Sequence, residues 1–160
     1  MQDIIYVEID DTVENKVIES FGSWVRDYQC IQRGAGCFTV AAICDGKAVG
    51  CAAIHPAKLI PPLEKYYDAF IELIEVDKEY RRQGIAKHMI EILEEQSRDY
   101  GYRQIRAWSS EDKVEALNMW YAMDYCMCPA AMLGKSIRPG SENKQIVGYY
   151  YAKMLNPKNE

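Results

Sequence analysis

The 160-residue sequence has no hydrophobic run that could cross a bilayer, and no tract rich in proline, serine or glycine. Its longest apolar runs lie near Phe38–Cys44 and Ala48–Ile54, well short of the roughly 20 residues that a membrane-spanning helix needs. The first ten residues are acidic and lack the basic start of a signal peptide. These absences predict one folded domain in the cytoplasm, with no membrane partner.

Patterns that bind metals are also missing. The chain has only two histidines, and its six cysteines include no C-x-x-C pair. Cys30, Cys37, Cys44 and Cys51 are spaced by seven, but this series crosses a predicted helix, strand, turn and second strand, so no single face collects them. The strand-like Cys126-Met-Cys128 stands alone. We therefore predict reduced, buried cysteines that pack as small apolar residues, and no metal.

An excess of basic residues is missing as well. The chain has 24 acidic and 19 basic residues, a formal charge of −5. This balance argues against nucleic-acid binding, which depends on neutralising phosphates. It permits a cationic partner such as an amine, although surface solubility is by itself the simpler explanation.

Hydrophobic periodicity predicts the order β-α-(α)-β-β-β-α-β-α-β-β, a mixed sheet with helices packed on it. Strands are expected at Ile4–Ile9, Phe38–Cys44, Lys47–Ile54, Ala69–Val76, Arg103–Trp108, Tyr125–Leu133 and Ile146–Leu155. Helices are expected at Val13–Ser20 (capped by Asp11 or Thr12), within Phe21–Gln32, from Ile85 to a stop at Gly101, and from a cap at Ser109, Ser110 or Asp112 to Met123. Asp45-Gly46 predicts a hairpin turn, and 55–68 and 137–144 read as loops.

The stretch R-R-Q-G-I-A at 81–86 places many hydrogen-bond donors where strand pattern changes to helix pattern. A helix start offers unpaired backbone N–H groups and a partial positive charge, which together favour an anion. Gly84 permits close backbone approach, and Arg81 and Arg82 can add charge-assisted bonds. The chain has neither the G-x-x-x-x-G-K-[ST] loop nor a G-x-G-x-x-G fingerprint after a strand. The local chemistry leaves two interpretations, an anion site and a solvated basic turn.

Residues 76–86 resemble the coenzyme-binding motif of the GNAT superfamily of N-acetyltransferases, whose core is [Q/R]-x-x-G-x-[G/A]. Arg81, Gly84 and Ala86 fill the three signature positions. The hairpin at Asp45-Gly46 and the stretch from Ala116 to Tyr125 resemble further parts of the family pattern. The resemblance implies one GNAT domain over residues 1–160, an α/β fold with a mixed, mostly antiparallel sheet of six or seven strands flanked by about four helices.

The same resemblance implies that acetyl-CoA is the cosubstrate, with its pyrophosphate over the loop and its pantetheine arm paired with the end of the fourth strand. The coenzyme contacts carried over in this way are Ile74, Glu75, Val76, Arg81, Arg82, Gln83, Gly84, Ile85, Ala86, Lys87 and Trp120. Lys113 stands where the family usually has an asparagine, so it either binds a coenzyme phosphate or points into water.

Acetyl transfer to an amine needs a base, because an alkylammonium has a pKa of about 10. Glu72 is the leading candidate, with a structural or ammonium-binding glutamate as the alternative. Strand alternation predicts that it shares a face with Ile74 and Val76, opposite Glu75. The family's usual tyrosine is replaced by Trp120, so the acid is either Tyr121 or water, and Trp120 itself packs against coenzyme or core.

Two functions of different classes follow from the resemblance. The first is N-acetylation of a primary amine on a small molecule, peptide or protein, by direct attack in a ternary complex. The second is a non-catalytic module that senses acyl-CoA. Transfer of a longer acyl group or transfer to a hydroxyl is a weaker third interpretation. Acceptor choice is expected to lie in the first helical region and in the loops at 56–68 and 137–144, and a homodimer stays open.

Overall fold

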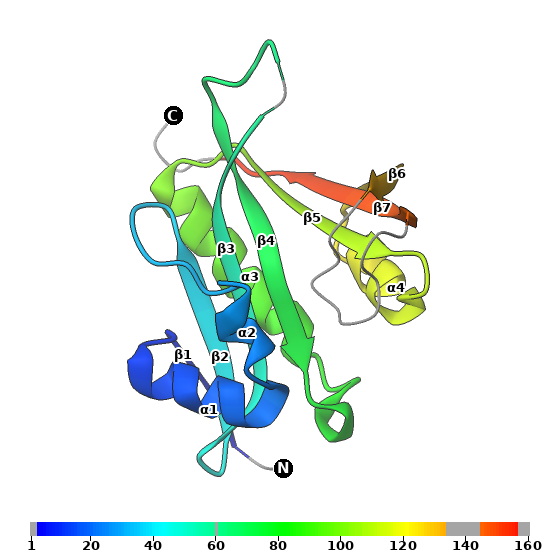
Figure 1. The fold of residues 1–160 in the computed structure, drawn as a ribbon. Helices are drawn as coiled ribbons and strands as arrows, with labels where there is room; N and C mark the ends of the chain where they lie inside the picture. The colour runs from blue at the N-terminus through cyan, green and yellow to red at the C-terminus, as the bar shows by residue number, and fades with distance from the viewer. Residues whose placement is uncertain (1–2, 60, 134–144, 157–160) are drawn as a thin grey trace.

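The structure is a computed structural model that describes residues 3–59, 61–133 and 145–156. Its described part holds one seven-stranded sheet in the order β1-β2-β3-β4-β5-β7-β6, four α-helices and a 3-10 turn (Figure 1). The strands are β1 (Ile4–Val7), β2 (Phe38–Cys44), β3 (Lys47–Lys58), β4 (Tyr67–Val76), β5 (Gln104–Ser110), β6 (Cys126–Leu133) and β7 (Gln145–Met154). The helices are α1 (Asp11–Phe21), α2 (Trp24–Asp27), α3 (Ile85–Tyr100) and α4 (Val114–Ala122), with the 3-10 turn η1 at Lys78–Tyr80. The predicted α/β fold with a mostly antiparallel sheet is confirmed.

The sheet consists of two halves that touch briefly. β4 and β5 are its one parallel pair, and their register covers only Ala69 with Ile105 and Phe70 with Arg106. Beyond this point the two strands diverge, as Figure 1 shows. In the part of the chain that the structure describes, no strand pairs with the β5-facing edge of β4 along its last residues.

Two apolar clusters cover the two faces of the sheet. On one face, α3 places Ile85, Met89 and Leu93 against β2–β5, in a cluster that also contains Trp120 of α4. On the other face, α1 and α2 bring Val17 and Val25 against β2 and β3. Each face of the larger half-sheet thus has its own helical layer, which keeps β4 in the middle of the domain.

β4 carries an irregularity at Glu72. Ala53 of β3 pairs with Leu73, but the next β3 residue, Ile54, pairs with Ile71, so Glu72 is an extra residue in the ladder. Such a bulge reverses the alternation of side chains beyond it. Ile71 and Ile74 both pack in the α3-side cluster, whereas Leu73 lies in the α1-side cluster. The prediction that Glu72 shares a face with Ile74 and Val76 is therefore wrong.

Several predicted helix starts are also wrong by a few residues. The N-cap of α1 is Asp10, whose carboxylate accepts from the Val13 N–H at 2.8 Å, rather than Asp11 or Thr12. α4 begins after Lys113 and has no side-chain cap, because Ser109 and Ser110 belong to β5. The second helical region is only the four residues of α2.

Other local predictions agree with the structure. Asp45 and Gly46 form the β2–β3 turn, both with positive φ (49° and 78°). Gly101 ends α3 in the left-handed conformation. The loop expected to begin at His55 is shorter, because β3 continues to Lys58. The loop expected at 137–144 lies outside the described residues.

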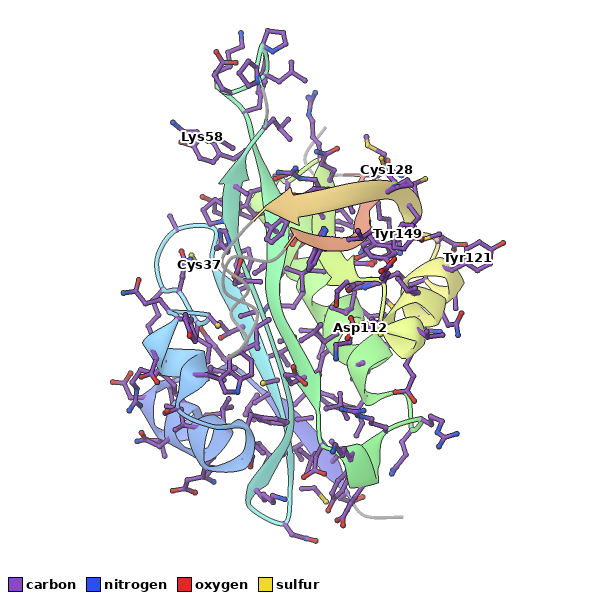
Figure 2. The ribbon with its side chains drawn as sticks, turned by 45° about the vertical axis from the view of Figure 1, so that its right-hand side comes forward. Cys37, Lys58, Asp112, Tyr121, Cys128 and Tyr149 are labelled. Atoms are coloured by element: carbon purple, nitrogen blue, oxygen red, sulfur yellow. The ribbon has the colours of Figure 1, made fainter. Side chains whose placement is uncertain are left out.

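All six cysteines are free, and half of them are buried as predicted: Cys30, Cys44 and Cys51. Cys37 is partly buried. Cys126 and Cys128 are exposed on the edge strand β6, so the prediction of burial is wrong for this pair. Figure 2 labels Cys128. An edge strand has one free side and less cover, which a C-x-C pattern alone does not reveal.

Glu94 is a buried acid that joins α3 to the smaller half-sheet. It is 3% exposed, and it accepts hydrogen bonds from the Tyr125 hydroxyl (2.9 Å), from Lys153 Nζ (3.0 Å) and from Arg98 (3.1 Å). Removing the carboxylate would leave these donors without an acceptor in a partly buried environment.

We therefore expect Glu94→Ala to lower the free energy of unfolding by about 3 kcal/mol, measured by urea denaturation. The matched control is Glu95→Ala on the same helix, whose half-exposed carboxylate bonds Arg98 at 3.2 Å. An exposed pair of this kind contributes less than about 1 kcal/mol. Equal losses in the two variants would contradict the structural role given to Glu94.

Candidate active site

The loop between β4 and α3 is shaped by two left-handed residues. Arg82 has φ +61° and Gly84, the N-cap of α3, has φ +81°. Gly84 supplies no side-chain cap, and the first hydrogen bond of the helix runs from His88 N to Gly84 O at 2.9 Å. The N–H groups of the first helical turn therefore have no partner within the helix, and together they form a positively polarised site.

The start of this loop is held by Asp77. Its carboxylate accepts from the Glu79 N–H at 3.1 Å and pairs with Lys47 of the neighbouring strand at 2.9 Å. These contacts lower the pKa of Asp77, the hydrogen bond from Lys47 being the largest cause. The turn η1 thus fixes the direction in which the chain enters the loop.

The predicted coenzyme residues of the loop take different positions. Arg81 donates from Nε to the Val76 carbonyl at 3.1 Å and lies 3.7 Å from Glu115 of α4, so it braces the strand end. Arg82 is exposed beside the helix start. The Gln83 amide reaches back to the Glu79 carbonyl at 3.5 Å. Arg82 is therefore the arginine best placed to meet an anion.

The first residues of α3 alternate between core and surface. Ile85 is 2% exposed, and a Cβ on Gly50 would lie 3.1 Å from its side chain, so helix and sheet are in close contact there. Ala86 is partly buried, and Lys87 is exposed, 3.8 Å from Glu91. The loop that precedes this turn is thus anchored on a rigid helix.

The end of β4 places backbone groups beside the loop. Ile74 and Val76 are partly buried against the α3-side cluster, and Glu75 pairs in register with Cys51 of β3. Since β5 does not pair with this segment in the described residues, its β5-facing edge is suited to an extended ligand added as a strand.

Glu72 lies next to His55, for which the sequence leaves two interpretations, a residue that approaches the substrate and a simple turn residue. His55 Nε2 is 3.1 Å from Glu72 Oε2, and His55 Nδ1 is 3.2 Å from the Pro56 carbonyl. The dipeptide His55-Pro56 reads as a turn, but β3 continues through it and pairs His55 with Phe70. The sequence did not reveal the full length of β3, and it is this length that places His55 beside the bulge in β4.

Both nitrogen atoms of His55 face acceptors, a carboxylate and a carbonyl oxygen. Two donated bonds require the doubly protonated ring. The hydrogen bond to Glu72 raises the pKa of His55, against an opposing effect of burial. The His55–Glu72 pair therefore holds a proton that it can release above the ordinary titration range of histidine.

A basic and an acidic side chain, Arg106 and Asp68, lie near the His55–Glu72 pair. The His55 and Phe70 ring centres lie 5.7 Å apart. The Arg106 guanidinium lies 5.9 Å from the centre of the same Phe70 ring. Asp68 is fully buried, pairs with Arg106 and accepts from the Gln104 amide at 2.8 Å. Asp68 also contributes to the raised pKa of His55.

The residues predicted on and before α4 have other surroundings than Glu72. Trp120 is 1% exposed, packs with Tyr125 and Tyr151, and donates from Nε1 to the Ser109 hydroxyl at 3.2 Å. Of the two alternatives for Trp120, the structure favours core packing over coenzyme contact. Tyr121 is 77% exposed and extends away from the sheet (Figure 2). Lys113 precedes α4 and lies 3.8 Å from Asp112.

Two further findings concern the described part of the chain. No group of three or more His, Cys, Asp or Glu side chains gathers there in an arrangement that could hold a metal ion. None of the helices described is both long and apolar enough to pass through a membrane.

The raised pKa of His55 has a consequence for stability. A group whose pKa is raised in the folded state stabilises the fold below its unfolded pKa of about 6.5, and this contribution disappears as the pH rises through the folded value. We expect the stability difference between wild type and His55→Gln to be largest near about pH 5.5 and to shrink by about pH 8.5, as measured by urea denaturation. A difference that grows with pH would contradict the His55–Glu72 pair.

Comparison with solved structures finds the same fold elsewhere. The ribosomal-protein-S18-alanine N-acetyltransferase from Escherichia coli superposes with a TM-score of 0.73 at 13% identity, covering 99% of this chain and 97% of the other. NAA60 from Arabidopsis thaliana, in complex with a bisubstrate analogue, gives 0.73 at 15% identity over 98% and 100%. The same protein in complex with acetyl-CoA gives 0.71 at 15% identity over 96% and 99%. At these identities the likeness shows the fold alone.

The family is shown by the sequence comparison. A search of curated proteins gives no match. The model of the "Acetyltransferase (GNAT) family", however, matches residues 3–125, which is more than half of the chain and includes the β4–α3 loop and α4. The chain therefore belongs to the GNAT family of acetyltransferases.

Proposed function

We propose that this protein transfers an acetyl group from acetyl-CoA to a primary amine. The observation that carries the proposal is the left-handed Arg82-x-Gly84 loop at the start of α3, next to the unpaired edge of β4. Family membership supports acetyl transfer, and the likeness to NAA60 with bound acetyl-CoA supports the choice of cosubstrate.

Each part of the coenzyme has a matching group in the chain. The N–H groups of the first turn of α3 and the exposed Arg82 suit the pyrophosphate. The free edge at Ile74–Val76 suits the amide groups of pantetheine, while Arg81 holds the strand end in place. The thioester of acetyl-CoA supplies an activated acetyl group.

The His55–Glu72 pair is the best-placed proton acceptor. An amine attacks only when neutral, although its pKa is about 10, so a base must take its proton. After His55 loses its own proton, the Glu72 carboxylate can take one from the amine and pass it to His55 Nε2, which lies 3.1 Å away, and Glu72 then stabilises the imidazolium that forms. The outward position of Tyr121 favours water as the acid for the leaving thiolate.

The bulge places the proton-accepting pair near the position expected for the thioester of acetyl-CoA. Glu72 lies just beyond Phe70, where the β4–β5 pairing stops, so the pair sits at the closed end of the gap between the strands. Coenzyme on the β4 edge and an amine from the His55 side would meet at this point. This arrangement supports direct attack in a ternary complex.

Coenzyme A should protect the wild type against thermal unfolding, and Gly84→Val should abolish that protection. Valine at φ +81° is strained and would project into the open space above the loop. At a hundredfold excess over its Kd, the ligand should raise Tm by roughly 5–10 °C in the wild type, by linkage and the size of the domain.

Gly46→Val is the matched control, because Gly46 has nearly the same φ (+78°) and equally open surroundings, but lies in the β2–β3 turn. Both variants should start less stable than the wild type, and only Gly46→Val should keep the ligand-induced shift. If the wild type shows no shift, the coenzyme site assigned to this loop is wrong.

The base can be tested by thiol release from acetyl-CoA with one fixed amine across a pH series. We expect kcat/KM to rise through the raised pKa of His55, that is, above about 6.5. His55→Gln should lower the rate roughly a hundredfold, the usual effect of losing a general base. Glu72→Gln removes the main cause of the raised pKa, so its rising limb should move to lower pH.

If the rising limb of the kcat/KM pH profile is unchanged in Glu72→Gln, the His55–Glu72 pair is not the base. Coenzyme protection without thiol release on any amine of a broad panel would instead favour a non-catalytic acyl-CoA sensor. The two results are separable, because the first concerns the pH profile and the second the presence of turnover.

A further inference from the structure

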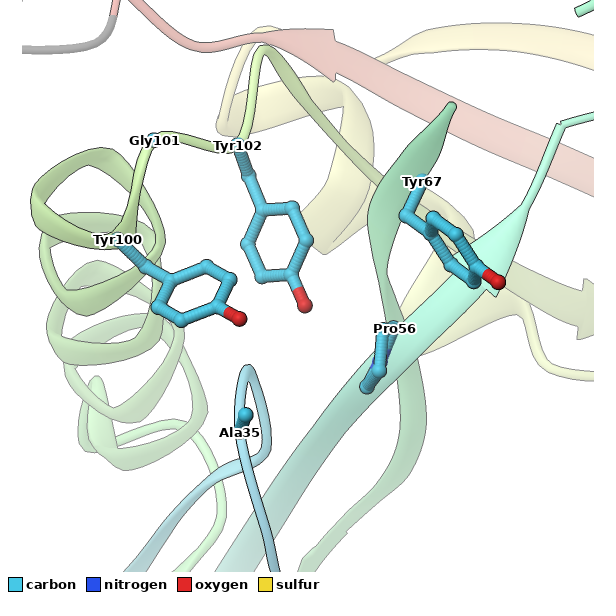
Figure 3. Close-up of a pocket in the computed structure, with 6 residues that line it drawn as sticks. All are labelled: Ala35, Pro56, Tyr67, Tyr100, Gly101 and Tyr102. Carbon is cyan, nitrogen blue, oxygen red and sulfur yellow. The ribbon is translucent and has the colours of Figure 1, made fainter. Parts of the chain in front are cut away.

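A cavity lies at the far end of α3 from the coenzyme loop. It has a volume of about 390 Å³ and is lined by Ala35, Pro56, Tyr67, Tyr100, Gly101 and Tyr102 (Figure 3). These residues come from the loop before β2, from β3 and β4, and from the end of α3 and the turn after it. Pro56 follows His55 on β3, and adjacent strand residues point to opposite faces, so the cavity and the His55–Glu72 pair lie on opposite sides of the sheet.

The walls of this cavity are fixed by contacts within the protein. Tyr102 is 4% exposed, and its hydroxyl donates to the Gly36 carbonyl at 3.0 Å. The Tyr100 ring lies 4.9 Å from the Tyr102 ring and is braced edge-on by Phe38 at 5.7 Å. Two aromatic rings are thus held in place before any ligand arrives, which lowers the entropy cost of binding.

Gly36 is what allows the loop to close on these rings. It has φ +79°, and a Cβ at this position would lie 2.2 Å from the Tyr102 hydroxyl and 3.2 Å from the Tyr100 ring. Any other residue would push the loop away from the tyrosines. The close approach is therefore a built feature of the cavity.

The electrostatics of the cavity favour a cation. Aromatic rings present negative faces, and the C-terminal end of the 16-residue helix α3 carries a partial negative charge. The hydroxyl hydrogen of Tyr102 is committed to Gly36, so its oxygen can only accept. Outside the six lining residues, Lys58 Nζ lies 6.0 Å from the centre of the Tyr67 ring, so this ring already has a cation beside it.

We propose that this cavity binds the ammonium group of a small organic cation, at a site separate from the amine acceptor and coenzyme sites. The lining supplies aromatic faces, acceptor oxygen atoms and a helix C-terminus, and none of the six lining residues is itself charged. A quaternary or alkylated ammonium matches this combination, because it offers charge spread over an apolar shell.

Choline is a suitable probe, and 3,3-dimethylbutan-1-ol is its uncharged isostere. Titration calorimetry without acetyl-CoA should show saturable binding of choline and roughly tenfold weaker binding of the alcohol, the size expected for cation–π attraction. Absence of choline binding, or equal binding of both probes, would overturn the proposal. Saturating coenzyme A should leave choline binding unchanged, and displacement by coenzyme would place choline in the transferase site instead.

Tyr100→Leu should weaken choline binding about tenfold, because it keeps an apolar side chain but removes the ring face. Tyr66→Leu is the matched control, since Tyr66 is as exposed as Tyr100 (52% against 51%) but does not line the cavity. Equal losses in both variants would also overturn the proposal. Because Tyr100 is half exposed, the variant is expected to fold, which far-ultraviolet circular dichroism checks.

Discussion

The short pairing between β4 and β5 is the constraint on which the site depends. Two residue pairs hold these parallel strands together, after which they separate and leave one edge of β4 open. In a fully paired sheet those backbone groups would be satisfied by the neighbouring strand and closed to any ligand. The helices on both faces hold β4 in place where β5 does not pair with it. The apolar cluster on each face is therefore kept beside the opening.

The bulge at Glu72 adds chemistry to that opening. An extra residue in the β4 ladder reverses the side-chain alternation at the place where β5 leaves. It brings Glu72 to the side occupied by His55 and sends Ile74 and Val76 into the α3-side cluster. One local irregularity therefore produces a polar pair above the sheet and an apolar support below it.

The coenzyme loop could be predicted from the sequence because its determinants are local. A glycine tolerates the positive φ at position 84, and the change from strand to helix pattern marks the helix start. The hairpin at Asp45-Gly46 and the stop at Gly101 follow from the same kind of rule. Where one residue and its immediate neighbours decide the conformation, the sequence is sufficient.

The catalytic side could not be predicted in the same way. The face of Glu72 depends on how β4 pairs with β3 at the bulge, where Ile54 meets Ile71 and Ala53 meets Leu73, and no local pattern marks the bulge. His55 was hidden by the proline that follows it, which suggests a turn although β3 continues. The contrast between Trp120 and Tyr121 depends on the rotation of α4 against the core, which the weak amphipathic pattern of that helix does not determine.

Helix α3 connects the two ligand sites inferred for this protein. Its first turn offers N–H groups to an anion at Gly84, and its C-terminal end, at Tyr100 and Gly101, lies beside the tyrosine-lined cavity. The dipole of one helix thus favours opposite charges at its two ends. Because α3 packs rigidly on β2 and β3 through Ile85, Met89 and Leu93, neither end can shift without disturbing the same apolar cluster. A cation at one end and a coenzyme pyrophosphate at the other would therefore act on one rigid element.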